Sequence, residues 1–362
     1  MGQPNRYFRH FYRFISKTVF IVAALLAVAF WGVGARLQSF FNGMGKNVQS
    51  STMRFGMLAS ADLILLPDDV RNMVTSDDAP NTDLVLVERT AHLKSTFYVA
   101  DPGRPNGIVE YVTVQHDGEK AVTEVFHHVL RKTNCGAQSN AVVLDIGANT
   151  GFYSMLALAE GCQRVLLFEP QPPCIRDIAH ALVKNGYEDR ASIIPYFVDV
   201  RSGRSVELDV ATACQGRWPI GQLEDAGYKP KTTKIMETVG VVDVLRADTR
   251  IVHGKVDTEG AEYYVLLSML PYIANGMVDS IVFEMTPMWW VHYGLSDRAA
   301  VIDQFVMLVK RYGMHCRVLE KVPWYKTELF TKENTSSLAA RIDTTYQTDF
   351  WFFKPGMDHR DA

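Results

Sequence analysis

Residues 141–154 have the sequence AVVLDIGANTGFYS, in which a short apolar run passes through a glycine-rich turn into a second apolar run. The first run predicts a buried strand over Ala141–Ile146, and the second predicts a helix over Phe152–Glu160. Gly147 allows a tight bend, and Gly151 allows close packing where the helix begins. A strand, a glycine turn and a helix in this order predict a nucleotide-binding turn in an α/β fold.

The rest of the chain continues this alternation of strands and helices. Further strands are predicted at Leu84–Val87, Phe97–Val99, Ile108–Val114, Arg164–Phe168, Ile193–Val198, Gly240–Leu245, Ile251–Val256 and Ser280–Phe283. Further helices are predicted at Glu119–Lys132, Pro173–Lys184, Tyr263–Leu270 and Arg298–Tyr312, with an insertion carrying a hairpin near Cys214–Thr233. Alternation of this kind predicts a mostly parallel sheet with helices on both faces.

The last two predicted strands, Met314–Leu319 and Phe350–Lys354, have no clear helix between them. They are therefore expected to form an antiparallel hairpin at one edge of the sheet. With this hairpin the sheet has the seven-stranded, Rossmann-like arrangement of class I methyltransferases.

The glycine turn also indicates which ligand it holds. Dinucleotide sites place a third glycine between the outer two so that the backbone can approach a pyrophosphate, whereas Asn149 occupies that place here. This pattern favours a ligand without phosphate, such as S-adenosylmethionine, with its amine near Asp145 and its carboxylate near N–H groups of the turn. Glu169 ends the second strand, where an acidic side chain accepts hydrogen bonds from ribose hydroxyls. The predicted cofactor-binding residues are Asp145, Gly147, Asn149, Gly151 and Glu169.

A charged segment, KVDTEGAE at residues 255–262, follows another predicted strand. Because ligands of open α/β sheets bind at the carboxyl ends of the strands, Lys255, Asp257, Glu259 and Glu262 are candidate catalytic or acceptor-binding residues. The alternative is that the two glutamates only cap the following helix. No metal site is expected, although a divalent cation held by these carboxylates is an open alternative.

The next predicted strand ends at the same edge with Glu284, and an aromatic segment follows it. Glu284, Trp289 and Trp290 are candidate acceptor-binding residues, and His292 is a candidate general base because its pKa suits that role. Each has a plainer alternative, since aromatic residues are often core and isolated histidines often lie on the surface.

These motifs together resemble those of the FkbM-type methyltransferases. The resemblance is carried by Val143–Ser154, Phe168–Pro170, Lys255–Glu262 and Val282–Glu284, and it spans about Thr123 to Lys354. It implies S-adenosylmethionine-dependent O-methylation of a hydroxyl, commonly on a sugar or natural product. It also implies that Asp199, after the third strand, is a cofactor-binding residue on the adenine side. Two alternatives stay open, an NAD-type oxidoreductase on a related fold and a non-catalytic nucleotide-binding protein.

The N-terminus predicts a membrane anchor. Arg6, Arg9, Arg13 and Lys17 precede an uncharged apolar stretch, Thr18 to Ala35, that is close to the length needed to cross a bilayer. We expect a single-pass type II protein with a luminal catalytic domain in the Golgi or endoplasmic reticulum, and a cleaved signal peptide is the main alternative. The predicted parts are a cytosolic tail (1–17), a transmembrane anchor (18–35), a stem (36–90) and a methyltransferase domain (91–362, core 123–354).

Composition limits the partners. The formal net charge of -3 over 362 residues gives no general attraction for nucleic acid, and the resemblance implies a hydroxyl-bearing acceptor as the partner. Five scattered cysteines do not suggest a disulfide framework, and no Cys/His cluster suggests zinc.

Overall fold

A computed structural model describes residues 64–75, 83–101, 117–136, 140–209, 214 and 233–358. The predicted tail and anchor and the predicted strand Ile108–Val114 lie outside these residues. Within the described part of the chain, none of the helices combines the length and the apolar character that crossing a bilayer requires.

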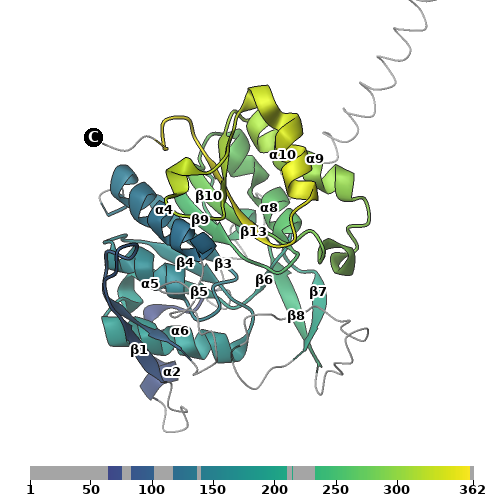
Figure 1. Cartoon of the computed structure of the whole chain (residues 1–362). Coiled ribbons are helices and arrows are strands. Elements are labelled where there is room, and N and C mark those ends of the chain that lie inside the picture. The colour runs from purple at the N-terminus through teal and green to yellow at the C-terminus, as the bar shows by residue number, and fades with distance from the viewer. Residues whose placement is uncertain are drawn as a thin grey trace, which may run out of the picture. The chain divides into compact units, whose positions relative to one another are not determined.

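The main sheet has eight strands in the order β12-β11-β13-β10-β9-β3-β4-β5 (Figure 1). Its parallel strands are β3 (Ala141–Ile146), β4 (Val165–Phe168), β5 (Ala191–Ile194), β9 (Arg250–Val256) and β10 (Ser280–Met285). The antiparallel part contains β11 (His315–Leu319), β12 (Leu329–Phe330) and β13 (Thr348–Phe353). This arrangement confirms the predicted α/β sheet.

Two details of the predicted sheet are wrong. The sheet has an eighth strand, β12, and the last two predicted strands do not form a simple edge hairpin. Instead β13 lies between β10 and β11 and pairs antiparallel with both. Helix α10 (Thr335–Asp343) precedes β13; it escaped prediction because only Leu338 and Ile342 give its sequence an apolar face.

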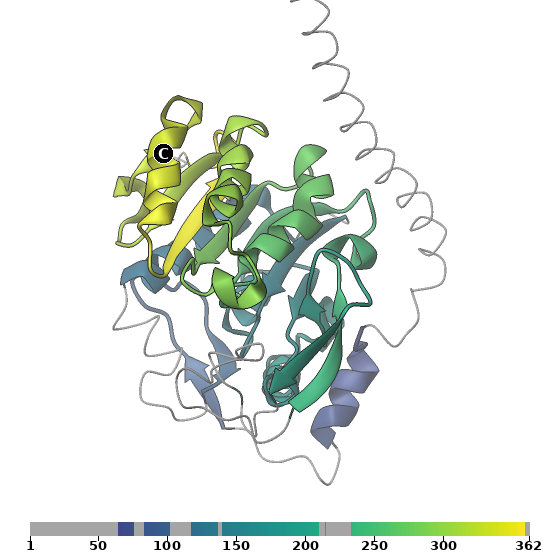
Figure 2. The ribbon, with the colours of Figure 1, turned by 90° about the vertical axis from the view of Figure 1, so that its right-hand side faces the viewer.

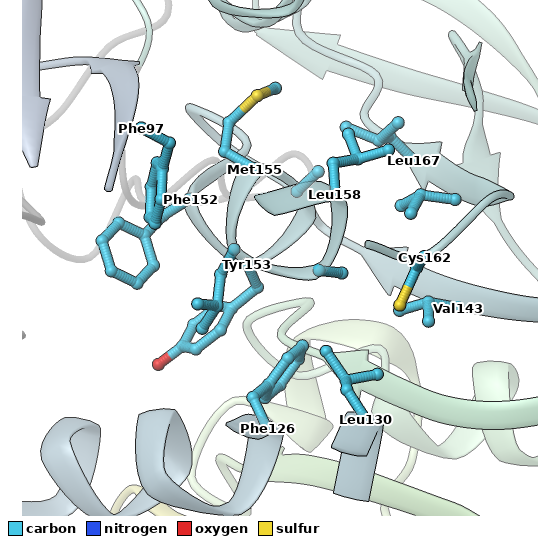
Figure 3. Packing of buried hydrophobic residues seen from close by; sticks show 14 of the residues in the cluster. Phe97, Phe126, Leu130, Val143, Phe152, Tyr153, Met155, Leu158, Cys162 and Leu167 are labelled. Carbon is cyan, nitrogen blue, oxygen red and sulfur yellow. The ribbon is translucent and has the colours of Figure 1, made fainter. Parts of the chain in front are cut away.

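Helices cover both faces of the sheet. One face packs against α4 (Asp117–Thr133), α5 (Phe152–Ala159) and α6 (Pro172–Asn185), and the other against α7 (Val241–Val244), α8 (Glu262–Ala274), α9 (Arg298–Lys310) and α10. Alternate strand residues divide between the two cores, as Val143 and Leu144 do. Figure 3 shows the first core, where Phe97 meets Phe152 and Phe126 meets Tyr153, with ring centroids 5.4 Å and 4.7 Å apart.

The folded unit begins earlier than predicted. Helix α2 (Pro67–Thr75) and strand β1 (Leu84–Val87) lie inside the expected stem, and β1 pairs antiparallel with β2 (Phe97–Ala100). The N–H of Leu65 donates to the carbonyl of Ile193 at 2.8 Å, which adds a bridge beside β5. The boundary expected at residues 90 and 91 is therefore wrong, because both elements belong to the domain.

A smaller sheet follows β5. The predicted strand Ile193–Val198 is divided at Pro195, so that β6 (Phe197–Val198) joins β8 (Thr233–Val239), which pairs antiparallel with β7 (Ser205–Asp209). Figures 1 and 2 show this hairpin apart from the yellow C-terminal strands. The predicted strand Gly240–Leu245 is instead the short helix α7. Short 3₁₀ helices complete the described chain: η2 (Glu188–Arg190), η4 (Trp290–Tyr293), η5 (Trp324–Lys326) and η6 (Lys332–Asn334).

Four of the five cysteines form disulfides, contrary to the expectation from their spacing. Cys135 pairs with Cys162, and Cys174 pairs with Cys214, while Cys316 is buried as a free thiol. The partners lie far apart in sequence and meet only through the tertiary fold.

Candidate active site

A pocket lies at the carboxyl ends of β3, β4 and β9, the edge at which open α/β sheets bind ligands. It is lined by Ile146, Gly147, Asn149, Phe168, Glu169, Pro170, Gln171, Tyr196, Phe197, Val198, Asp257, Thr258 and Glu259. The predicted residues Gly147, Asn149, Glu169, Asp257 and Glu259 are thus brought together in one cavity.

Glu169 is held rigidly in this pocket by two backbone groups. Its Oε2 accepts from the N–H of Asn149 and its Oε1 from the N–H of Gln171, both at 2.8 Å. Burial raises the pKa of Glu169 to about 7, against the lowering effect of these two hydrogen bonds. The side chain of Gln171 also donates to this carboxylate, so Glu169 is fixed in one orientation in the pocket, from which it can accept from ligand hydroxyls.

The glycine turn differs from expectation in how its N–H groups are used. Those of Gly147 and Ala148 donate to the carbonyl of Phe168, that of Asn149 donates to Glu169, and that of Gly151 donates to Ala148. These four N–H groups already have acceptors within the protein, and the contact between turn N–H groups and a ligand carboxylate stays a prediction.

Asp145 contacts helix α5 and not the pocket. Its Oδ2 accepts from the N–H and the hydroxyl of Ser154, at 3.0 Å and 2.6 Å, in the first turn of α5. Burial raises the pKa of Asp145 to about 6. Asp145 does not line the pocket, and this geometry favours a role in fixing α5 to β3 over direct cofactor binding.

Gly147 is required by a close approach between two loops. It has φ +80°, and a Cβ at this position would lie 1.8 Å from the carbonyl oxygen of Asp257. The turn after β3 and the end of β9 are thus in backbone contact. Only glycine lets Asp257 sit this close to the turn.

Lys255 forms the centre of a charged cluster beside the pocket. The side chain of Lys255 is only 1% exposed. Its Nζ lies 3.3 Å from Oδ2 of Asp257 and 3.2 Å from Oδ1 of Asp349. Asp257 is 33% exposed and lines the pocket, whereas Asp349 is buried on the far side of the ammonium. Despite burial, which opposes the charge, the pKa of Lys255 is raised well above its usual range by Asp257, Asp349, Glu284 and Glu119.

Two further carboxylates complete this cluster. Glu119 of α4 accepts from the hydroxyl of Tyr153, and Glu284 of β10 accepts from Gln347 at 3.0 Å. Burial raises the pKa of Glu119 to about 7 and that of Glu284 well above its usual range, with neighbouring carboxylates adding to both shifts. Because of these raised pKa values, Glu119 and Glu284 hold protons more readily. Those protons offset part of the negative charge that Lys255 alone does not balance.

Carboxylate oxygens in this region form two close groups, of the kind that can hold a metal ion. Those of Glu119, Glu284 and Asp349 lie within 4.8 Å of one another, as do those of Asp257, Glu259 and Glu284. The expectation of no metal stays a prediction.

Comparison with known proteins identifies the central part of the domain. Residues 145–290 match the family model of the methyltransferase FkbM domain. The resemblance predicted from the motifs is confirmed for this stretch, and it favours methyl transfer over the oxidoreductase alternative. No curated protein matches the chain significantly.

Several solved methyltransferase structures show remote similarity. A precorrin-6y C5,15-methyltransferase from Geobacter metallireducens GS-15 is 11% identical, covers 63% of this chain and 87% of its own, and has a TM-score of 0.29. The N-terminal domain of human METTL16 is 11% identical and covers 83% and 92% of the two chains, with a TM-score of 0.31. A structure of that METTL16 domain in complex with SAH is 10% identical, covers 79% and 82%, and has a TM-score of 0.30.

Within the matched residues 145–290, Glu262 and Trp290 lie in the core. Glu262 is fully buried and accepts from the N–H of Gly260 at 2.7 Å, from Thr286 at 3.1 Å and from the indole of Trp290 at 3.1 Å. Burial raises the pKa of Glu262 to about 7. Trp290 stacks on Phe305, with ring centroids 6.1 Å apart. These contacts favour structural roles over the catalytic and acceptor-binding roles expected.

The remaining candidates lie around the pocket without lining it. His292 is exposed and contacts the ring of Trp289, whose Cβ packs over Gly260. Asp199 is buried and pairs with Arg204 at 2.5 Å, which favours a structural role over adenine binding. Gly151, also outside the pocket lining, has φ +79° where α5 begins.

Sequence reasoning missed two members of the charged cluster. Both Glu119 and Asp349 lie outside residues 145–290. A signal for Glu119 exists, because it occupies the same helical face as Val122 and Phe126, where a carboxylate is unexpected. Asp349 is likewise the one charged residue of the apolar strand β13.

Proposed function

We propose that this chain is an S-adenosylmethionine-dependent O-methyltransferase that acts on a hydroxyl of a neutral acceptor such as a glycan. The observation that supports it best is the clamped Glu169 in a pocket next to Asp257 and Glu259. The match to the FkbM family supports methyl transfer as the reaction.

The chemistry of the lining residues fits this cofactor. Glu169 would accept from the ribose hydroxyls, and Phe197 and Val198 offer an apolar wall for adenine. Glu259, a carboxylate of the same pocket, would pair with the positively charged amine of the methionine end. When bound, S-adenosylmethionine supplies an electrophilic methyl group.

Asp257 is the proposed general base. It lies between the pocket and Lys255, which favours its charged form and fixes its orientation. Asp257 would take the proton from the acceptor hydroxyl as that oxygen gains the methyl group. The surrounding carboxylates disfavour an anionic acceptor, which supports a neutral sugar hydroxyl as the target.

The proposal is tested by transfer of a labelled methyl group from S-adenosylmethionine to a panel of neutral glycosides. We expect label in at least one glycoside with wild-type protein and loss of at least 100-fold with Asp257→Asn. Cofactor binding by that variant should stay within a few-fold of wild type. Full turnover by Asp257→Asn would remove it as the base.

We also propose that residues 18–35 anchor the protein in the membrane with a luminal domain. The flanking basic residues support this topology, and so do the two disulfides, since disulfides persist in oxidising compartments. Protease treatment of sealed microsomes should leave the domain intact until detergent is added. Digestion without detergent would contradict the proposed topology.

A further inference from the structure

The two disulfides have different surroundings. Cys135–Cys162 joins the end of α4 to the loop after α5, away from the pocket lining. Cys174, in the first turn of α6, is bonded to Cys214, and both side chains are buried. Sγ of Cys214 lies 3.2 Å from Oδ1 of Asn149, so this disulfide is in direct contact with the glycine turn. A disulfide sulfur has no proton to donate, and the contact is therefore one of packing.

Two backbone N–H groups, those of Asn149 and Gln171, donate to the carboxylate of Glu169 and together form the Glu169 clamp. The Cys174–Cys214 disulfide lies near both of these groups. Gln171 is fixed to the first turn of α6, where its carbonyl accepts from Ile175 at 2.9 Å. Cys174 belongs to that same turn. The disulfide therefore connects α6, to which Gln171 is fixed, with the sulfur of Cys214, which packs on Asn149.

Asn149 is the member of the clamp with the less common backbone conformation. Its φ is +53°, in the left-handed region, which asparagine adopts more readily than most residues but less readily than glycine. In this conformation its N–H donates to Glu169 at 2.8 Å. Contact between Cys214 and the amide of Asn149 limits the rotation of this side chain and so helps to keep the N–H in place.

We propose that the Cys174–Cys214 disulfide is a positioning element of the cofactor pocket, acting through Asn149 on Glu169. This inference rests on the proposed function in taking S-adenosylmethionine as the ligand. Loss of the disulfide would remove one of the contacts that hold Asn149 in the clamp, and the ligand would have to order this part of the turn when it binds. We expect about tenfold weaker binding, the usual effect of ordering a side chain and a short turn.

The test is calorimetric titration of S-adenosylmethionine into full-length protein carrying Cys174→Ser and Cys214→Ser. The matched control carries Cys135→Ser and Cys162→Ser. The bonded residues are 40 and 27 positions apart, so both variants should lose similar stability by loss of a cross-link. We expect the dissociation constant to rise about tenfold for the first variant and to stay within twofold for the control. Equal affinities in the two variants would overturn the inference.

Asn149→Gly provides a second test that keeps both disulfides. Glycine accepts φ +53° and removes only the amide that Cys214 contacts. We expect a similar tenfold loss, and combining Asn149→Gly with the Cys174 and Cys214 replacements should add less than threefold, because both act through one contact. Wild-type affinity in Asn149→Gly, or fully multiplicative losses, would overturn the inference. Wild-type protein that does not bind S-adenosylmethionine would instead refute the proposed function.

Discussion

Replacement of Glu169 tests how the pocket holds the ribose. In the free protein both carboxylate oxygens already accept from backbone N–H groups at 2.8 Å, and the same oxygens would accept from two ribose hydroxyls. A hydrogen bond to a charged group contributes about 1.5–3 kcal/mol, so removing two should cost about 3–6 kcal/mol. We therefore expect Glu169→Ala to weaken S-adenosylmethionine binding by about 10²–10⁴-fold.

The same residue should make binding depend on pH. Burial raises the pKa of Glu169 to about 7 in the free protein, and only the charged form can accept from both hydroxyls. Affinity should therefore fall as the pH is lowered, by about tenfold between pH 8 and pH 6. In Glu169→Gln this dependence should be absent, because the amide does not titrate.

Isothermal titration calorimetry at several pH values measures both effects, with circular dichroism to confirm folding. Glu262→Gln is the matched control, because Glu262 has a similarly raised pKa but lies in the core outside the pocket. It should lose stability and keep the pH dependence of binding. Binding by Glu169→Ala within threefold of wild type would refute the assignment of Glu169 to the ribose.

Other predictions concern packing, charge and metal. Gly147→Ala should abolish cofactor binding in titrations, because its Cβ would lie 1.8 Å from the carbonyl oxygen of Asp257; retained affinity would contradict this close approach. Lys255→Met should lower the free energy of unfolding in urea by about 3 kcal/mol, since it leaves buried carboxylates unpaired, and an unchanged midpoint would show that the ion pairs are dispensable. The melting temperature should fall from pH 5 to pH 7.5, because Glu119 and Glu262 have folded pKa values near 7 while unfolded glutamates titrate near 4.5; a rise over this range would be inconsistent with their burial. EDTA should leave methyl transfer unchanged, and a loss restored by a divalent cation would establish a metal at the carboxylates.

Local sequence signals predicted much of the fold and five of the thirteen residues that line the pocket. The glycine turn, the acidic end of β4 and the segment after β9 are each continuous in sequence, and Gly147, Glu169 and Asp257 do line one pocket. The periodicity of apolar residues also placed β3 and β9 closely, because buried parallel strands have long apolar runs.

What escaped prediction depends on contacts between distant parts of the chain. Asp349 approaches Lys255 only because β13 inserts beside β10, and the pairing of Cys174 with Cys214 depends on the course of the tertiary fold. Asp145 and Glu262 were expected to meet ligands, but neither lines the pocket: Oδ2 of Asp145 accepts from Ser154, and Glu262 accepts from N–H and hydroxyl groups in the core. Sequence identifies a polar residue at the edge of a sheet, while its partners decide whether it faces the ligand.

The binding of the methyl donor is tested most directly by titrating S-adenosylmethionine into the full-length wild-type protein in detergent and then displacing it with S-adenosylhomocysteine. We predict a saturable isotherm with one site per chain and complete competition by the product. A folded protein that gives neither binding heat nor a thermal shift with either compound would contradict the central claim that this pocket holds the methyl donor.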